Sequence, residues 1–315
     1  MMQKMHHLTF GLKMKHLLPL KYIDAVADAG SIRQAAERLA ITSTALNRRV
    51  IAMEEELGVP IFERLPRGVR LSTAGEILVH HIRSQISDFE RVKSQIADLS
   101  GERRGHVSIA CSQALLPYFL PEQISSYRKE HSAVTFSVLL RDRTAAEQAL
   151  VDLSADLALV FEPLRMLEFH NLLTVRQQVH AVMNKDHPLA EKKQLRLRDC
   201  LQHPVALPTA HFGVRHLLEI AVRKISANLQ PVVESDSFEF LNHHALSEKI
   251  ISFQIPIGLP NTTQGINLIN RPIDTRDVAL GAIFVGQLRG RNLSVAAARF
   301  ANQMIETFAD RYDCE

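Results

Sequence analysis

Hydrophobic residues near the start of the chain recur every three or four positions, which is the spacing of amphipathic helices. Three such stripes predict three short helices: Leu20, Ile23, Val26 and Ala27; Ile32, Ala35, Ala36 and Leu39; and Leu46, Val50, Met53 and Leu57. Gly30 can end the first helix and Ser31 can cap the second, while Thr42 or Ser43 can cap the third. The pattern predicts a small bundle whose third helix begins at the surface.

The outer face of this third helix is polar near its start. Ser43, Thr44, Asn47 and Arg48 lie there, whereas the acidic run 54–56 lies at the far end, where phosphate would repel it. In the major groove of DNA, Arg pairs with guanine, and Asn, Ser or Thr pair with other base edges. The stripe and the polar face together favour a helix-turn-helix that binds double-stranded DNA. The alternative is a solvated face on an ordinary helical bundle.

A basic turn follows the three helices. Arg64, Arg67 and Arg70 surround a Pro/Gly turn that leads into a predicted strand over 69–71. A hairpin with a basic tip is typical of a wing that contacts DNA phosphates or the minor groove. Ser72 or Thr73 can cap the next helix.

One long helix is predicted from Thr73 to about Leu99, a stretch without proline. At 1.5 Å per residue it would be about 40 Å long. Its heptad seam consists of Leu78, Ile82, Gln85, Phe89, Val92, Ile96 and Leu99. Such a seam favours pairing of two chains, with Gln85 able to set the register. The alternative is a helix packed on its own domain.

Beyond a polar hinge at 100–106, short apolar runs alternate with helical stripes. Predicted strands cover 107–111, 134–140, 157–161, 179–183, 205–207, 232–234, 250–253, 266–269 and 278–284. Predicted helices cover 117–129, 144–153, 214–225, 237–246 and 293–308. This alternation favours α/β layers with mostly parallel sheets.

Two sequence blocks carry a specific resemblance. They read GSIRQAAERLAITSTALNRRVIAMEEELGVPIFER and RGVRLSTAGE, and through them residues 20–81 resemble the N-terminal domain of LysR-type transcriptional regulators. Members of that family often have proline at the position of Thr44 and serine at the position of Asn47. Because both positions would face bases, these departures affect which operator sequence is expected to be recognised, and not the fold. The resemblance and the pattern give these DNA-contacting candidates: Ser31, Thr42, Ser43, Thr44, Asn47, Arg48, Arg64, Arg67, Arg70 and Ser72.

The resemblance also implies an overall organisation. An all-α winged helix-turn-helix domain is expected over 15–72, a dimerisation helix over 73–100, and an α/β effector domain over 101–315. The effector domain is similar to periplasmic binding proteins in the order of its elements and in segments such as DLALVF, AVMNKDHPLA and NLSVAAARF. Two lobes are expected, lobe I over 106–177 and 272–315 and lobe II over 178–271.

An effector is expected in the cleft between these lobes, because ligands of α/β sheets bind beyond the carboxyl ends of the strands. The candidate residues are Ser112, Gln113, Ala114, Glu162, Thr209, His211, Phe212, Arg215 and Ser237. Two helix N-termini among them favour a small organic anion. Glu162 and His211 can instead favour a ligand with an amine or hydroxyl, and an ordinary capping or loop role is the alternative for each residue.

The distribution of charge also distinguishes the N-terminal domain from the rest of the chain. Residues 1–73 contain 11 Lys/Arg and 7 Asp/Glu, a net charge of +4, whereas the rest of the chain is near −1. A basic end on a nearly neutral body is expected when one module meets a polyanion. The hydrophobic fraction of 46% supports a sizeable core and argues against disorder.

Cysteines, termini and missing motifs narrow the class further. Cys111, Cys200 and Cys314 are few and widely spaced, as in a reducing cytoplasm; buried thiols are expected, with a redox pair of Cys111 and Cys200 as the alternative. No apolar run reaches the roughly 18 residues of a membrane span. The N-terminus does not resemble a signal peptide, and translation can start at Met1 or Met14.

No HExxH, CxxC, P-loop or GxSxG motif occurs, so neither catalysis, a metal nor a cofactor is expected. The sequence therefore predicts a cytoplasmic regulator that binds an interrupted inverted repeat of DNA as a homodimer or homotetramer, with RNA polymerase as a candidate partner. The rival interpretations are an architectural DNA-binding protein that ignores ligands, and a solute-binding protein or enzyme of the periplasmic-binding fold.

Overall fold

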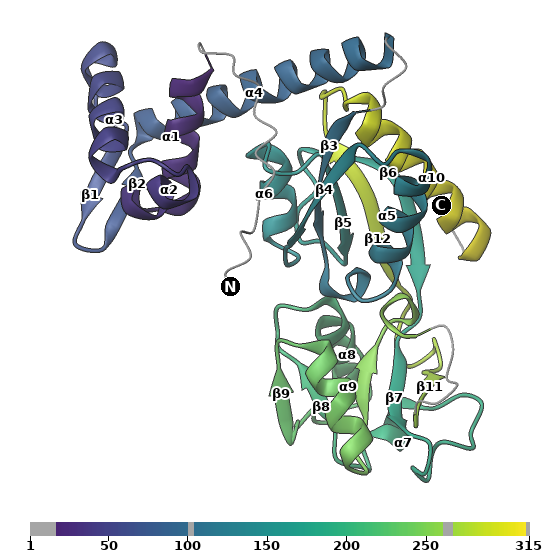
Figure 1. Ribbon diagram of the computed structural model, residues 1–315. Coiled ribbons are helices and arrows are strands. Elements are labelled where there is room, and N and C mark those ends of the chain that lie inside the picture. Colours follow the sequence, from purple (N-terminus) through teal and green to yellow (C-terminus); the bar gives the residue numbers. More distant parts are fainter. Residues whose placement is uncertain (1–16, 100–103, 261–266, 313–315) are drawn as a thin grey trace, which may run out of the picture. The chain divides into compact units, whose positions relative to one another are not determined.

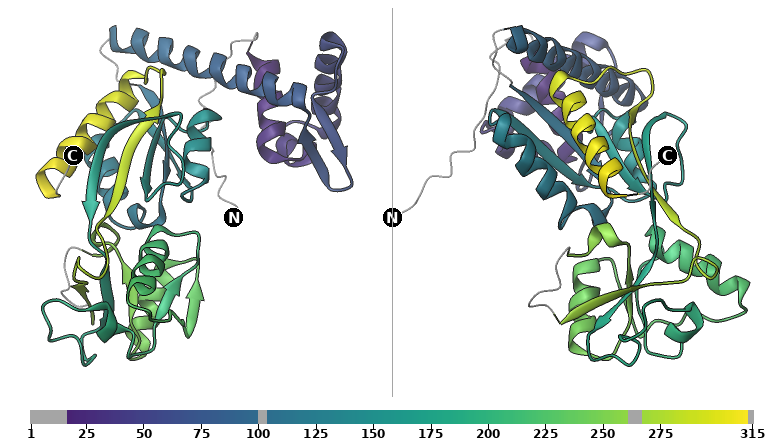
Figure 2. Two further views of the ribbon diagram at one scale, coloured as in Figure 1. Left: turned by 180° about the vertical axis from the view of Figure 1, so that it is seen from behind. Right: turned by 90° about the vertical axis from the view of Figure 1, so that its right-hand side faces the viewer.

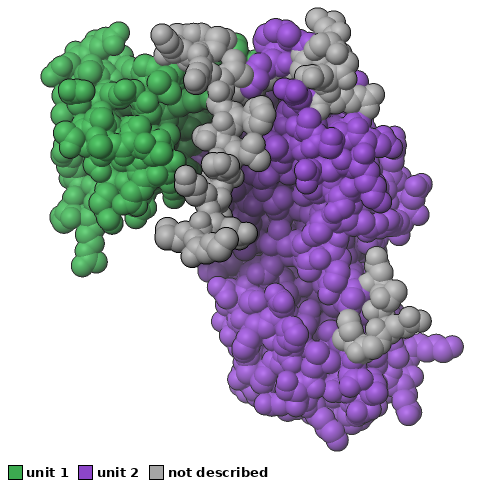
Figure 3. All heavy atoms as spheres, in the orientation of Figure 1, with its two compact units in different colours: residues 1–89 green, residues 90–315 purple. Residues whose placement is uncertain are grey.

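The computed structural model describes residues 17–99, 104–260 and 267–312 of the chain. Two compact units comprise residues 1–89 and 90–315 (Figure 3). Met1, Met14 and Cys314 lie outside the described residues.

The first unit is a three-helix bundle with a two-stranded hairpin (Figure 1). Its elements are α1 (Leu18–Ala29), α2 (Ile32–Arg38), α3 (Ser43–Leu57), β1 (Phe62–Leu65), β2 (Gly68–Leu71) and the first part of α4 (Thr73–Leu99). The predicted boundaries are confirmed in detail: Gly30 ends α1 in a left-handed conformation, and the hydroxyls of Ser31 and Thr42 accept hydrogen bonds from the backbone N–H groups of Gln34 and Ala45. The apolar stripes meet in one core formed by Tyr22, Ile23, Val26, Ala35, Ala36, Leu46, Val50, Ile61, Phe62, Val79 and Ile82.

Leu57 is an exception to the predicted third stripe. It is 45% exposed at the end of α3, because Gly58 turns the chain away there in a left-handed conformation. The inward face of α3 therefore ends at Met53, which packs partly buried against the core.

Helix α4 serves two environments along its length. Leu78 and Ile82, the first residues of the predicted seam, pack into the core of the first unit, and Ile82 is fully buried. Arg83 of α4 also forms an ion pair with Asp24 of α1 at 2.7 Å. Further along, Val92 is 40% exposed. The start of the seam therefore belongs to its own domain, and only the later part is available for pairing.

The second unit contains two lobes, each built on sheets and helices (Figure 1). In lobe I, a five-stranded sheet has the order β4-β3-β5-β12-β6. Its strands are β3 (Gly105–Cys111), β4 (Val134–Leu140), β5 (Leu157–Phe161), β6 (Phe169–Gln177) and β12 (Gly281–Leu288), and its helices are η1 (Gln113–Leu115), α5 (Phe119–Glu130), α6 (Ala145–Val151) and α10 (Val295–Arg311).

Helices cover both faces of the lobe I sheet, as Figure 2 shows for α10. Strand β5 is buried throughout, and its residues alternate between the two sides. Leu157, Leu159 and Phe161 join the cluster that includes α5 and α10, whereas Ala158 and Val160 join the cluster under α6. A strand buried on both faces needs an apolar residue at every position, which explains the uninterrupted LALVF run.

Lobe II contains two smaller sheets, with the orders β10-β7-β11 and β8-β9. Its strands are β7 (His180–Asn184), β8 (Ala206–Pro208), β9 (Val233–Ser235), β10 (Ser252–Gln254) and β11 (Leu268–Pro272), and its helices are α7 (Leu197–Cys200), α8 (Gly213–Lys224), α9 (Phe238–Ser247) and η2 (Pro256–Gly258). The chain crosses between the lobes twice, from β6 to β7 and from β11 to β12.

The strand directions differ from the predicted mostly parallel arrangement, since the lobe I sheet is mixed, the β10-β7-β11 sheet is antiparallel and the β8-β9 pair is parallel throughout. Strands β3, β4 and β5 pair in parallel, but β12 runs antiparallel to both β5 and β6, and β7 runs antiparallel to β10 and β11. Parallel neighbouring strands need a crossover connection, which is usually a helix. Among the described residues no helix lies between β11 and β12, and the chain enters β12 directly from lobe II, so β12 runs antiparallel to β5.

Both described cysteines are buried thiols, as expected. Cys111 on β3 and Cys200 at the end of α7 have no exposed surface, and burial raises the pKa of each thiol to about 12. Thiols that stay protonated at neutral pH are poor nucleophiles and react slowly with oxidants. Cys111 and Cys200 therefore have a packing role.

Candidate DNA interface and effector cleft

The N-terminal half of α3 presents a polar surface. Ser43, Thr44 and Arg48 are exposed, while Leu46 and Val50 face the core on the opposite side of the helix. Thr42 lies just before the helix, where its hydroxyl caps Ala45 at 3.2 Å. The exposed polar side chains therefore gather over the first two turns of α3. In a recognition helix, this is the part that enters the major groove.

The two neighbouring arginines of α3 have different surroundings. The guanidinium of Arg49 lies over the ring of Tyr22 on α1, 4.4 Å from its centroid. Such a cation–π contact holds a side chain against its own domain. Both arginines are exposed, so the contact with Tyr22 is what distinguishes Arg49 from Arg48.

The three arginines on the hairpin of β1 and β2 also differ in their partners. Arg67 is exposed at the turn, whereas Arg70 lies opposite Glu63 in the antiparallel register and pairs with its carboxylate at 2.6 Å. Arg64 on β1 donates a hydrogen bond to Asn47 of α3 at 3.1 Å. Arg67 therefore presents its positive charge at the tip of the wing, Arg64 keeps its charge beside the neutral Asn47 amide, and the charge of Arg70 is offset by Glu63.

We expect Arg67→Ala to weaken DNA binding uniformly across sequences and to lower the salt slope, d log K/d log[salt], by about 1 unit, because one phosphate contact is lost. Arg70→Ala should change the slope less, since Glu63 already offsets that charge. Fluorescence anisotropy at several salt concentrations measures both slopes. Equal changes for the two variants would contradict this assignment of the wing.

The remaining DNA-contact candidates are capping residues. Ser31 caps α2, and Ser72 caps α4 by accepting from the N–H of Gly75 at 3.0 Å while donating to the carbonyl of Pro60 at 2.6 Å. Each lies at a helix N-terminus, where free backbone N–H groups attract phosphate.

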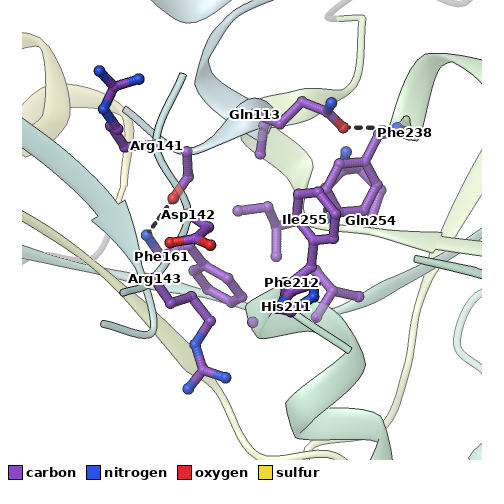
Figure 4. Close-up of a pocket in the computed structure, with 14 residues that line it drawn as sticks. Gln113, Arg141, Asp142, Arg143, Phe161, His211, Phe212, Phe238, Gln254 and Ile255 are labelled. Atoms are coloured by element: carbon purple, nitrogen blue, oxygen red, sulfur yellow. Dashed lines mark hydrogen bonds between the residues drawn. The ribbon is translucent and has the colours of Figure 1, made fainter. Parts of the chain in front are cut away.

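In the second unit, a cavity lies between the two lobes (Figure 4). Its enclosed volume is about 20 Å³, which is room for about one water molecule, so the two lobes would have to separate to admit a small organic molecule. Its lining residues are Ser112, Gln113, Ala114, Arg141, Asp142, Arg143, Phe161, His211, Phe212, Gly213, Val214, Phe238, Gln254 and Ile255.

Five of the predicted effector residues line this cavity. Ser112, Gln113 and Ala114 follow β3 in lobe I, and His211 and Phe212 precede α8 in lobe II. The Ser112 hydroxyl accepts from the N–H of Phe161 at 3.0 Å, so it fixes the end of β5. The structure thus brings together the two loops that sequence reasoning chose.

Gln113 connects the lobes directly. Its side-chain oxygen accepts from the N–H of Phe238 at 2.7 Å, and its nitrogen donates to the carbonyl of Asp236 at 3.0 Å. Both partners lie at the N-terminus of α9, where an anion would also bind. The Gln113 amide therefore holds the two lobes together at the rim of the cavity (Figure 4).

The other four predicted effector residues lie outside the cavity lining. Glu162, with φ +53°, accepts from the N–H of Ala282 at 2.8 Å and stabilises the sheet. Arg215 forms ion pairs with Glu219 and Glu234 within lobe II. Ser237 caps α9, and the N–H of Thr209 donates to the carbonyl of Ser235.

Sequence reasoning missed the three residues that follow β4. Arg141, Asp142 and Arg143 line the cavity from lobe I because β4 runs parallel to β3 and ends at the same edge of the sheet. Asp142 accepts from the N–H groups of Thr144 and Ala145 and so begins α6. The signal was present, since the run RDR directly follows the predicted strand over 134–140.

Two arginines and one aspartate bring charge to the cavity wall. Arg143 is 8% exposed and donates to the carbonyl oxygen of Glu162. Burial lowers the pKa of Arg143 and the Glu162 carboxylate opposes this shift, so the guanidinium stays charged. The floor is apolar, since Phe212 and Phe238 pack edge to face with centroids 5.1 Å apart. The lining therefore combines aromatic rings with charged side chains that are bonded to nearby backbone groups.

A winged helix-turn-helix followed by a two-lobed α/β domain with a cleft defines a ligand-responsive, DNA-binding regulator as the class. Residues 17–76 match the bacterial regulatory helix-turn-helix proteins of the lysR family, and residues 100–309 match the LysR substrate binding domain. The chain belongs to the LysR family of transcriptional regulators.

Individual relatives support this conclusion. The RuBisCO operon transcriptional regulator of Allochromatium vinosum is 24% identical over 307 residues, which cover 95% of this chain and 98% of that protein. Two further curated relatives align over 66% and 65% of their own length. These relatives are transcriptional regulators, a class of protein that is not enzymatic.

Solved structures share the fold. Full-length CbnR complexed with its target DNA has a TM-score of 0.63 at 17% identity, covering 92% of this chain and 99% of that one. The effector binding domain of QuiR in complex with shikimate has a TM-score of 0.57 at 16% identity, covering 67% of this chain and all of that one.

Two features are absent from the residues that the structure describes. No helix among residues 17–99, 104–260 and 267–312 combines the length and hydropathy needed to cross a bilayer. Within the same ranges, no group of three or more His, Cys, Asp or Glu side chains is arranged to hold a metal ion.

Proposed function

We propose that this regulator reads operator DNA with the first two turns of α3 in the major groove and with the wing on the adjacent phosphates. The observation that carries the proposal is the exposure of Ser43, Thr44 and Arg48 on a single face, next to an exposed Arg67. Base edges specify the sequence, whereas phosphate contacts position the domain. The net charge of +4 on residues 1–73 supplies the attraction to DNA.

We further propose that two chains pair through the later part of α4 and bind an interrupted inverted repeat, one half-site for each chain. Val92, at 40% exposure, supports this because an apolar seam residue is favoured in contact with another helix. A functional division into 15–72, 73–100 and 101–315, a tetramer, contact with RNA polymerase and a cytoplasmic location belong to the same proposal.

Light scattering of the purified full chain tests the pairing. The expected mass is that of a dimer or tetramer, and Val92→Glu should shift the population towards the monomer by placing a charge in the seam. A monomer for the unaltered chain at micromolar concentration would contradict it.

The effector that we propose is a small organic anion with an apolar body, bound between the lobes. Arg141 and Arg143 bring positive charge to one wall, although their guanidinium groups donate to the carbonyls of Leu140 and Glu162 in this arrangement, and the start of α8 at Gly213 supplies backbone N–H groups on the other wall. A ligand that contacts both lobes changes their relative angle only if it favours one arrangement over the other. Such a bias would link the cleft to DNA binding.

Thermal denaturation of the full chain with a panel of small carboxylates, shikimate included, tests this site. A binding compound at 100 times its Kd should stabilise the protein by about 2.7 kcal/mol. Arg141→Gln should weaken the binding of that compound. Arg128→Gln, which removes the same charge from the exposed face of α5, should leave its binding unchanged. An architectural DNA-binding protein would show no stabilisation by any member of the panel.

A further inference from the structure

Asn47 and Arg64 belong to different elements but form one polar unit. Asn47 lies in the second turn of α3 and Arg64 lies on the wing strand β1, and a guanidinium nitrogen of Arg64 is 3.1 Å from the side-chain oxygen of Asn47. Arginine has only donors, so the group that faces it must be the amide oxygen. The NH₂ group of Asn47 is therefore turned away from the wing.

A second tie holds the same two elements in place. Glu54 lies seven residues after Asn47, about two turns along the same side of α3. One of its carboxylate oxygens accepts from the backbone N–H groups of Ile61 at 2.8 Å and Phe62 at 3.1 Å. Glu54 thus fixes the start of β1 against α3, which places Arg64, two residues further on, beside Asn47.

This arrangement changes what Asn47 can offer to a base. A free asparagine recognises adenine through two bonds, since its oxygen accepts from N6 and its nitrogen donates to N7. With one lone pair of its oxygen engaged by Arg64, Asn47 is a weaker acceptor towards a base, while its NH₂ group and the neighbouring N–H groups of Arg64 are donors. Guanine presents two acceptors in the major groove, N7 and O6, and matches this set better than adenine does.

We propose that the Asn47–Arg64 pair makes the protein select guanine over adenine at the base pair that Asn47 faces, with Arg64 as the positioning residue. This inference rests on the proposed function, in which α3 reads the major groove. In this proposal Arg64 contributes to sequence specificity. From its charge alone, Arg64 would be expected only to contact phosphate.

Selection of preferred sites from randomised double-stranded DNA by the full-length protein tests the pair. Asn47→Ala identifies the base pair in question, because preference should be lost there and kept elsewhere. Arg64→Met removes the donor while retaining the aliphatic stem. Its matched control is Arg70→Met, which removes the same charge from the same hairpin but leaves Asn47 and Arg64 unaltered.

Both methionine variants should weaken binding to all sequences. Only Arg64→Met should lower the ratio of guanine to adenine at the mapped base pair, by about ten-fold for the loss or gain of one good base contact. The inference is overturned if the unaltered protein selects adenine there, or if Arg64→Met and Arg70→Met give the same base ratios. If the unaltered protein selects no sequence at all, the proposed function fails together with the inference.

Discussion

Replacing Arg48 by alanine is expected to weaken binding to the preferred DNA sequence by about 1–3 kcal/mol, roughly 5- to 150-fold. Arg48 is exposed on the second turn of α3, beside Ser43 and Thr44, where its guanidinium can reach a base edge. Binding to unrelated DNA should fall much less, because a single phosphate contact contributes only a small part of non-specific affinity. Fluorescence anisotropy with preferred and unrelated duplexes measures both effects.

Arg49→Ala is the matched control for this prediction. It removes the same charge from the next position of the same helix, but the Arg49 guanidinium lies over Tyr22. We expect a loss of about 0.5–1 kcal/mol in the free energy of unfolding, with sequence preference retained. If the two variants lost the same preference, or if Arg48→Ala retained it, our placement of α3 on DNA would be wrong.

Gly75→Ala is expected to destabilise the DNA-binding unit by about 3 kcal/mol. A Cβ atom at this position would lie 2.1 Å from the carbonyl oxygen of Ile61. That oxygen accepts from the N–H of Ser72 at 2.9 Å, so it cannot move without breaking the joint between the wing and α4. Urea denaturation followed by circular dichroism measures the loss.

Gly58→Ala separates this clash from ordinary backbone strain. Gly58 has φ +70°, but a Cβ atom there would have no neighbour within 4 Å. We expect about 1 kcal/mol for the strained conformation alone. A Gly75→Ala protein no less stable than Gly58→Ala would show that the packing of Ile61 against α4 is looser than the structure indicates.

The first unit could be predicted closely because its signals are local. Apolar stripes, the caps at Ser31 and Thr42 and the left-handed turn at Gly30 each involve residues within four positions of one another. The role of Glu54 could not be predicted, since its partners, Ile61 and Phe62, are set by the fold. The acidic run at the end of α3 therefore contains a residue with a structural function.

The second unit was harder to predict for a physical reason. Strand β6 (Phe169–Gln177) was missed because its burial follows neither alternation nor a continuous apolar run. The direction of each strand depends on the connections between the lobes, so it cannot be predicted from the hydrophobic pattern within the strand. Gln254 and Ile255, at the end of β10, reach the cleft only through this topology.

Within the cleft, a general rule identified part of the site. The loops after β3 and before α8 were chosen because ligands bind beyond strand ends, and both line the cavity. The same rule applied to β4 would have found Arg141 and Arg143. Glu162 and Arg215 also lie near predicted strand ends, but neither lines the cavity. Glu162 accepts from the N–H of Ala282, and Arg215 pairs with Glu234.

The central claim is that the chain recognises a particular DNA sequence through its N-terminal unit. The most direct test is a competition titration of the full-length protein at 150 mM salt, with the sequence selected from a random pool against a scrambled duplex of equal length. Recognition by α3 predicts a preference of about 10³-fold or more for the selected sequence. Equal affinity for the two duplexes would contradict it.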